Sequence, residues 1–130
     1  MRKSAVGAQK ILVVEDEPGI GEVCLRVLSD AGFEVDLAVN GVVAEDKLWG
    51  KAYDVAIIDI RTPLRDGKQL FQCISERYPR LEKGVIFTTG DVMGGDTQYF
   101  LEKCGRPFLL KPFTPAELKS VVSETLKSLS

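Results

Sequence analysis

The chain has 130 residues, 45% of them hydrophobic and 28% charged, which is the size and composition of one globular domain. Its net charge of −2 argues against electrostatic binding to nucleic acid or to an anionic membrane. No apolar stretch approaches the ~20 residues of a membrane helix. Because the sequence has no histidine, it excludes histidine-based acid–base catalysis, histidine metal sites and phosphohistidine chemistry within this chain.

The first nine residues are expected to be a flexible leader or linker remnant, and residues 10–130 a single domain. The start, MRKSAVGAQK, has basic residues but no hydrophobic run after them, so it is unlike a secretory signal. The cysteines, Cys24, Cys73 and Cys104, are odd in number and far apart. We expect reduced thiols in a cytoplasmic protein, packed as small hydrophobic side chains.

Five short apolar segments recur along the chain and are predicted to be β-strands. They cover 11–14, 35–39, 55–59, 85–89 and 108–110. Four are continuous apolar runs rather than alternating ones, which is typical of parallel strands covered by helices on both faces.

Segments with helical periodicity lie between these strands. The first is predicted to run from Pro18, which suits a first helical turn, to about Gly32. Ala44 and Leu48 mark a short second helix, and a third ends before Pro79.

The last two predicted helices differ in the strength of their signals. Gly94 and Gly95 disfavour helix, so the fourth helix is predicted to span only about 96–105. The final helix is the clearest, because Thr114 and Glu117 form a capping-box pattern with proline at the first helical position.

Strand and helix therefore alternate five times, which predicts an α/β protein with a doubly wound, five-stranded parallel sheet. In such sheets ligands bind beyond the carboxyl ends of the strands, near the point where strand order reverses. The residues that follow the strands are the candidates for function.

Charged and hydroxyl side chains follow four of the predicted strands. The acidic run at 15–17 follows the first strand, Asp59 ends the third, Thr89 ends the fourth and Lys111 follows the fifth. Each of these residues, taken singly, is explained without a functional role, as a helix cap, a residue of high strand propensity or a solvated charge. Brought together, two carboxylates ~4 Å apart would repel by about 4 kcal/mol at an effective dielectric near 20. One lysine cannot cancel three carboxylates, whereas Mg²⁺ can, and the regular acidic loop of a Ca²⁺ site is missing.

Asp59 is unusual because the apolar strand 55–58 ends in its carboxylate. Beside Mg²⁺, such a carboxylate can attack phosphorus to give an aspartyl phosphate. The metal and Lys111 would then neutralise charge on the transferring oxygens, and Thr89 would hydrogen-bond one of them.

Four motifs in register resemble the receiver domain of two-component response regulators, over about residues 9–129. The motifs are VVEDE, IIDIRTPLRDG, FTTG and LLKPF. The resemblance implies a flavodoxin-like receiver fold with Asp59 as phosphoacceptor. It implies that Mg²⁺ is bound by Asp59, by Asp16 directly, by Glu15 through water and by the backbone carbonyl of Arg61, whose N–H would contact the phosphoryl group.

The resemblance also implies roles at the last two strands. Thr89, Gly90 and Lys111 would hold the phosphoryl group, and a cis bond before Pro112 would aim the ammonium. Phe108 matches an aromatic switch position whose rotamer is linked to movement of Thr89, although plain core packing explains a phenylalanine there nearly as well.

Arg61 and Asp91 lie two positions after Asp59 and Thr89, and Arg61 is not the residue most expected there. We hypothesise that the two side chains meet across the mouth of the site and tune water access to the phosphoryl group. The lifetime of the phosphoryl group in an Arg61→Ala variant would test this hypothesis.

The implied function is a phosphorylation switch with only slow self-dephosphorylation, not an enzyme. A histidine kinase or a histidine phosphotransfer protein would phosphorylate Asp59, and the change would regulate a partner or an attached domain. The segment GRPFLLKPF further resembles receivers of hybrid sensor histidine kinases. No nucleic-acid or membrane contact by this chain is expected, and a weak or phosphorylation-dependent dimer stays open.

Two other classes of function were weighed. A Mg²⁺-dependent phosphohydrolase with an aspartate nucleophile usually has a second acid where this chain has Arg61, and it needs a cap over small substrates. A flavodoxin-like FMN module would have a Gly- and Thr-rich phosphate-cradling turn after the first strand, where this chain has EDE.

Overall fold

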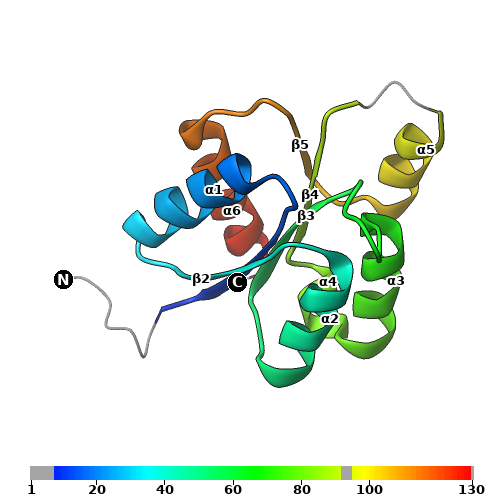
Figure 1. Cartoon of the computed structure of the whole chain (residues 1–130), viewed down its shortest axis with the longest axis horizontal. Helices are drawn as coiled ribbons and strands as arrows, with labels where there is room; N and C mark the ends of the chain where they lie inside the picture. The colour runs from blue at the N-terminus through cyan, green and yellow to red at the C-terminus, as the bar shows by residue number, and fades with distance from the viewer. Residues whose placement is uncertain (1–7, 92–94, 130) are drawn as a thin grey trace.

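The computed structural model in Figure 1 describes residues 8–91 and 95–129. Most of the predicted leader and the last residue of the predicted domain lie outside them. Strands and helices alternate in the described part, in the order β1 (Lys10–Val14), α1 (Pro18–Asp30), β2 (Glu34–Ala38), α2 (Gly41–Gly50), β3 (Val55–Asp59), α3 (Gly67–Arg77), α4 (Pro79–Glu82), β4 (Val85–Thr89), α5 (Gly95–Cys104), β5 (Phe108–Leu110) and α6 (Pro115–Ser128).

The five strands form one parallel sheet in the order β2-β1-β3-β4-β5. The predicted doubly wound α/β fold is therefore confirmed. In Figure 1, α1 and α6 cover one face of the sheet, and α2, α3, α4 and α5 cover the other. Strand order reverses between β1 and β3, which places the expected ligand crevice beyond the carboxyl ends of these two strands.

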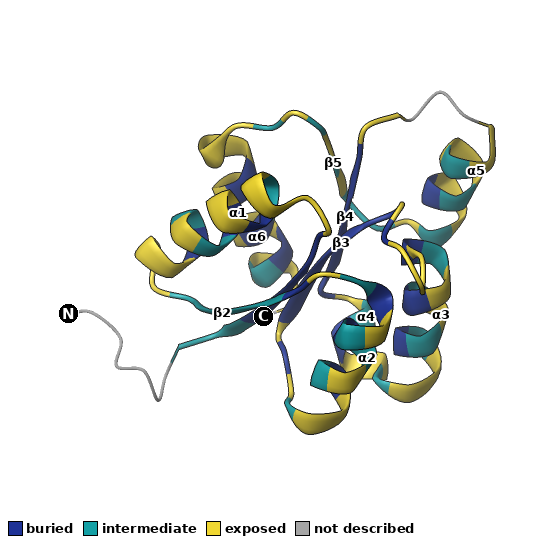
Figure 2. Ribbon diagram, viewed as in Figure 1, coloured by how far each residue is buried: buried dark blue, intermediate teal, exposed yellow. Residues whose placement is uncertain are grey.

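Alternate residues of each strand fill two separate cores, since neighbouring side chains in a strand point to opposite faces. In β1, Ile11 and Val13 pack beneath α1 and α6, whereas Leu12 and Val14 pack beneath the helices of the other face. Figure 2 shows the central strands as the most buried part of the molecule. The continuous apolar runs that predicted these strands follow from burial on both faces.

The predicted helix boundaries agree closely with the structure, with one helix missed. The capping box of α6 is present, because Thr114 Oγ1 accepts from the Glu117 N–H at 3.0 Å and Glu117 accepts from the Thr114 N–H at 2.8 Å. The helix predicted near 96–105 is α5. The missed helix is α4, a four-residue helix that begins at Pro79, where the third helix was predicted to have ended.

The cysteines are free thiols, and Cys24 is buried on the inner face of α1. Burial, with a contribution from the negative charge of Glu15, raises the pKa of the Cys24 thiol to about 11. This thiol is therefore protonated and unreactive at neutral pH, as expected for a cysteine that packs as a small hydrophobic side chain.

A strained turn follows β3. Leu64 has a φ of 71°, and the Arg65 N–H donates to the Pro63 carbonyl at 2.9 Å, which defines a γ-turn of the rare positive-φ form. The same carbonyl accepts from the N–H of Gly41 at 3.1 Å, and a Cβ on Gly41 would lie 2.1 Å from the Arg65 carbonyl oxygen. The turn is thus held against the start of α2. The side chain of Leu64 is 73% exposed, so its packing does little to offset the strained φ.

The Leu64→Gly substitution is expected to stabilise the protein. Relief of a positive φ at a residue with a Cβ gives about 1–2 kcal/mol, and the added freedom of glycine in the unfolded chain offsets about 0.4–1 kcal/mol of it. Thermal unfolding should therefore show a rise in Tm of a few degrees. Leu64→Ala is the matched control, since it removes the exposed side chain but keeps the Cβ, and an equal gain in that variant would contradict the role assigned to φ.

Candidate functional site

The carboxyl ends of β1, β3 and β5 bring three charged residues to one edge of the sheet. Glu15 directly follows β1, Asp59 ends β3 and Lys111 directly follows β5. The Lys111 ammonium lies 2.9 Å from Glu15 Oε1 and 2.9 Å from Asp59 Oδ2. These contacts join residues that lie 96 and 52 positions apart in the chain.

A third carboxylate, that of Glu17, completes the cluster. Its Oε1 lies 3.2 Å from the Lys111 ammonium, and its backbone N–H donates to Glu15 Oε2 at 3.2 Å. Glu15 and Asp59 are buried, whereas the Glu17 side chain is 61% exposed. The Lys111 ammonium therefore faces two buried carboxylates and a third at the solvent boundary. Because one positive charge cannot balance three negative ones, the cluster keeps an excess of negative charge.

The pKa directions follow from this charge balance. Burial raises the pKa of the Glu15 carboxyl, and it outweighs the hydrogen bonds from Lys111 and the Glu17 N–H, with the Asp59 charge adding to the rise. Burial alone would lower the pKa of Lys111, but the hydrogen bonds and charges of Glu15 and Asp59 are stronger, and the pKa of the ammonium rises. Lys111 therefore stays charged throughout the physiological pH range.

Backbone and hydroxyl donors hold Asp59 in place. Its Oδ1 accepts from the backbone N–H of Arg61 at 3.0 Å, while its Oδ2 faces Lys111. Its carbonyl accepts from the Thr62 hydroxyl at 2.5 Å and from the Thr62 N–H at 3.1 Å. Thr62 is buried, and the sequence analysis assigned it no role. Within the described ranges, no buried side-chain nitrogen or oxygen lacks a hydrogen-bond partner.

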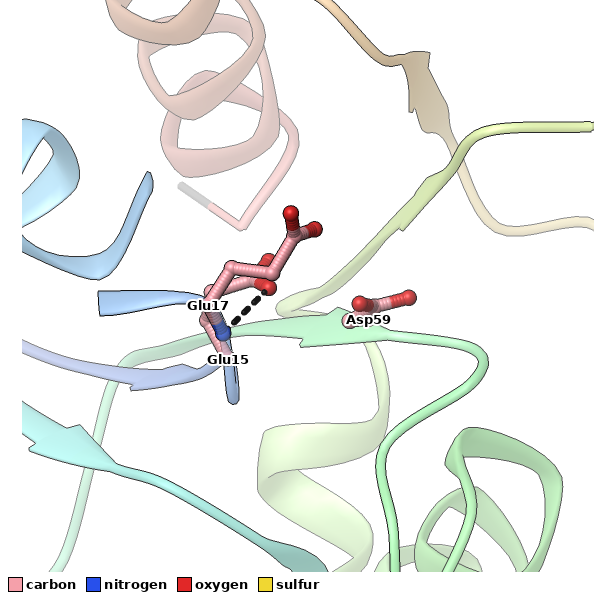
Figure 3. Close-up of side chains that lie close together, drawn as sticks. All are labelled: Glu15, Glu17 and Asp59. Atoms are coloured by element: carbon pink, nitrogen blue, oxygen red, sulfur yellow. Dashed lines mark hydrogen bonds between the residues drawn. The ribbon is translucent and has the colours of Figure 1, made fainter. Parts of the chain in front are cut away.

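The acidic groups that could hold a cation differ in one member from the predicted set. Ligand oxygens of Glu15, Glu17 and Asp59 lie within 4.8 Å of one another. Figure 3 shows these three side chains close together. Asp16 is not part of this group, and its side chain is exposed. The chain bends at Asp16 between the end of β1 and the start of α1, and Glu15 and Glu17 on either side of the bend both reach Lys111. Sequence reasoning missed Glu17, because the run of three acidic residues does not indicate which of them turn toward the site.

Residues at the ends of β4 and β5 border the same edge. Thr89 is buried, and its hydroxyl donates to the Asp91 carbonyl at 3.0 Å and accepts from the Asp91 N–H at 3.2 Å. Gly90 is exposed. The backbone N–H of Lys111 donates to the Thr89 carbonyl at 2.8 Å, and this bond holds the backbone of Lys111 against the end of β4. The implied cis peptide bond between Lys111 and Pro112 is present.

Phe108 does not pack in the core. It lies on the edge strand β5, and 43% of its surface is exposed. The hypothesised meeting of the Arg61 and Asp91 side chains stays a prediction. The backbone N–H of Arg61 donates to the Asp59 carboxylate. The backbone of Asp91 exchanges two hydrogen bonds with the Thr89 hydroxyl.

The arrangement has the elements needed to bind a phosphoryl group and a cation together. Asp59 offers a carboxylate at the carboxyl edge of the sheet, and Lys111 offers a positive charge beside it. Glu15 and Glu17 add oxygen ligands of the kind that hard divalent cations prefer. None of the helices in the described ranges is long and apolar enough to cross a membrane.

Comparison with known proteins agrees with this geometry. The chain matches the response regulator receiver domain family over residues 11–123. It is 38% identical over 117 residues to Response regulator Rre1 of Synechocystis, an alignment that covers 89% of this chain and 51% of that protein. It is 30% identical over 125 residues to Histidine protein kinase 1 of Candida albicans, covering 88% of this chain and 5% of that protein.

The fold is also found among solved structures. A CheY-like response regulator receiver domain protein from Methanospirillum hungatei superposes with a TM-score of 0.86, over 95% of this chain and 97% of that one, at 23% identity. The chain spans about half the length of the response regulators it matches. From the family match and the shared fold, the chain belongs to the response regulator receiver domains of two-component signalling.

Proposed function

We propose that Asp59 is the phosphoacceptor of this receiver domain and that its phosphorylation switches the conformation of the domain. The observation that carries the proposal is the position of Lys111, whose ammonium lies 2.9 Å from Asp59 Oδ2 at the carboxyl edge of the sheet. A buried carboxylate beside a permanent cation is placed to receive a phosphoryl group whose oxygens that cation can neutralise.

The acidic donors fit Mg²⁺. Glu15 and Asp59 supply carboxylate oxygens, and the backbone carbonyl of Arg61 lies two residues beyond Asp59. We assign Asp16 as the direct ligand implied by the family resemblance, since it follows Glu15 in the chain and its exposed side chain is open to solvent. When bound, the ion would neutralise charge on the transferring phosphoryl group.

The proposed donor is a phosphohistidine of a histidine kinase or a histidine phosphotransfer protein. A carboxylate oxygen of Asp59 forms the new bond to phosphorus, the bond from phosphorus to the histidine nitrogen breaks, and the imidazole leaves with that electron pair. Lys111 and the Arg61 N–H stabilise the oxygens of the transferred group, and the exposed backbone at Gly90 borders them.

The proposed switch is the Thr89 hydroxyl. It is bound to the backbone of Asp91, and exchange of that bond for a phosphoryl oxygen would draw the end of β4 toward Asp59. Phe108 pairs with Phe87 in the register of β4 and β5, so movement of β4 reaches this half-exposed ring. The domain would act by this change of shape, with only slow loss of the phosphoryl group, and the parent protein could be a response regulator or a hybrid kinase.

Phosphorylation at Asp59 can be tested with a small phosphodonor. Incubation with acetyl phosphate and Mg²⁺ is expected to add one phosphoryl group, measured by intact-protein mass spectrometry, and Asp59→Asn should abolish the addition. Asp54→Asn is the matched control, because Asp54 precedes the same strand at its opposite end and accepts a hydrogen bond from the Lys10 N–H. Addition that persists in Asp59→Asn would refute the assignment, and continuous phosphate release from a generic phosphoester would favour the hydrolase alternative.

The metal ligands can be separated by titration calorimetry with Mg²⁺. Asp16→Asn is expected to weaken Mg²⁺ binding by about tenfold or more, because it removes an anionic ligand oxygen. Glu17→Gln removes an equal charge from the same turn and is the matched comparison, with a smaller expected loss. If Glu17→Gln weakens binding as much as or more than Asp16→Asn, Glu17 is the ligand in place of Asp16.

The charge balance of the metal-free site predicts a pH-dependent stability. The raised pKa of Glu15 means that the folded state binds that proton more tightly than the unfolded state, so its contribution to stability falls as pH rises from about 4.5 through the raised pKa. With a chelator present, Glu15→Gln is therefore expected to raise Tm at pH 7 by a few degrees. The gain should shrink as pH falls toward 4.5.

Glu22→Gln on α1 is the control for this comparison, because its carboxylate is exposed and makes no ion pair within the described ranges. Its Tm should follow that of the parent protein at every pH. A gain in Glu15→Gln that is equally large at pH 4.5 and pH 7 would show that packing, not the buried charge, is responsible.

A further inference from the structure

A second concave site lies at the opposite edge of the sheet from Asp59. It is a pocket of about 560 Å³ between the end of α2 with the loop into β3, and the end of α3 with α4. These segments precede β3 and β4, so the pocket faces the amino ends of the strands whose carboxyl ends carry the candidate phosphorylation site. Its volume is within the ~300–1,000 Å³ of small-molecule sites.

The walls of this pocket are aromatic and aliphatic. Leu48 and Leu81 are buried and form its apolar base, and Tyr53 and Tyr78 line it further. Trp49, the single tryptophan of the chain, lines the pocket with 83% of its surface exposed. Figure 2 shows the end of α2 and the following loop as an exposed region. A large exposed indole beside an apolar base gives a flat ligand a surface on which to stack.

Two of the three cations of the pocket have no partner within the described residues. Lys51 is paired with Glu34 and with Asp36, and the Tyr53 hydroxyl donates to the same Asp36. The side chains of Arg77 and Arg80 are exposed, and neither forms an ion pair or hydrogen bond with another described residue. In a chain with a net charge of −2, this pocket therefore presents two uncompensated guanidinium groups.

We propose that this pocket binds a small organic anion with a flat apolar body, such as an aromatic carboxylate or sulfonate. The ring system would stack on Trp49 above the leucine base, and the acid would be bound by Arg77 and Arg80, whose planar donors suit such groups. The site is separate from the candidate phosphorylation site, and its occupation does not depend on the function proposed for Asp59.

The test uses 8-anilinonaphthalene-1-sulfonate as the probe, because it carries a flat aromatic body and one sulfonate. Saturable one-site binding is expected, with Trp49 emission falling by energy transfer as the emission of the probe rises. The double variant Arg77→Gln/Arg80→Gln should bind the probe about tenfold or more weakly. N-phenyl-1-naphthylamine, which has the same rings without the sulfonate, should bind more weakly than the sulfonate and be insensitive to the double substitution.

Three further variants make the result specific. Arg26→Gln/Lys119→Gln removes two exposed positive charges from α1 and α6 on the other face of the sheet and should bind the probe as the parent does. Trp49→Phe should keep an aromatic wall but lose the energy transfer, and Asp59→Asn should bind normally. Circular dichroism checks that each variant is folded.

Four outcomes would overturn the proposal. They are an unchanged affinity in Arg77→Gln/Arg80→Gln, equal affinities for the charged and uncharged probes, an equal loss in Arg26→Gln/Lys119→Gln, and probe fluorescence without energy transfer from Trp49.

Discussion

The ammonium of Lys111 is the interaction on which the edge of this sheet depends. Among the residues that the structure describes, it is the one positive charge that binds Glu15, Glu17 and Asp59 at once, and Asp59 and the two glutamates are distant from it in sequence. Without it, two buried carboxylates would face each other in a region where their repulsion amounts to several kcal/mol. With it, the site is held together but remains negative, and a receiver domain that binds a divalent cation requires such a state. Under the proposed function, the incomplete compensation would serve cation binding at a cost in stability to the metal-free protein.

Much of the fold could be predicted because its signals are local. The apolar runs of the central strands reflect burial on both faces, and Thr114 with Glu117 specifies the start of α6 through two hydrogen bonds within one turn. The convergence of Asp59 and Lys111 could also be inferred, since parallel strands place their carboxyl ends at one edge. In each case a short sequence pattern and a general rule of α/β folds were sufficient.

The remaining features depend on contacts that no local pattern encodes. Glu17 joins the cluster through the bend of the chain at Asp16, whereas the sequence alone gives three acidic residues without their directions. The γ-turn at Leu64 is held by bonds from both Arg65 and Gly41, and leucine itself disfavours its positive φ. The pocket beside Trp49 is formed by two segments, 48–53 and 77–81, that precede different strands, so its aromatic and basic residues come together only in the folded chain.

The surroundings of Asp59 hold its carboxylate in place at the end of β3. One oxygen accepts the Arg61 N–H and the other faces Lys111, so the side chain has a single defined orientation. Thr62 binds the backbone carbonyl of the same residue, which ties the end of β3 to the loop that follows. A threonine at this buried position satisfies the carbonyl without adding a charge to a site that already holds too much negative charge. Under the proposed function, this anchored strand end with charged side chains that can exchange partners would let a local change of charge at Asp59 be transmitted to β4 and β5.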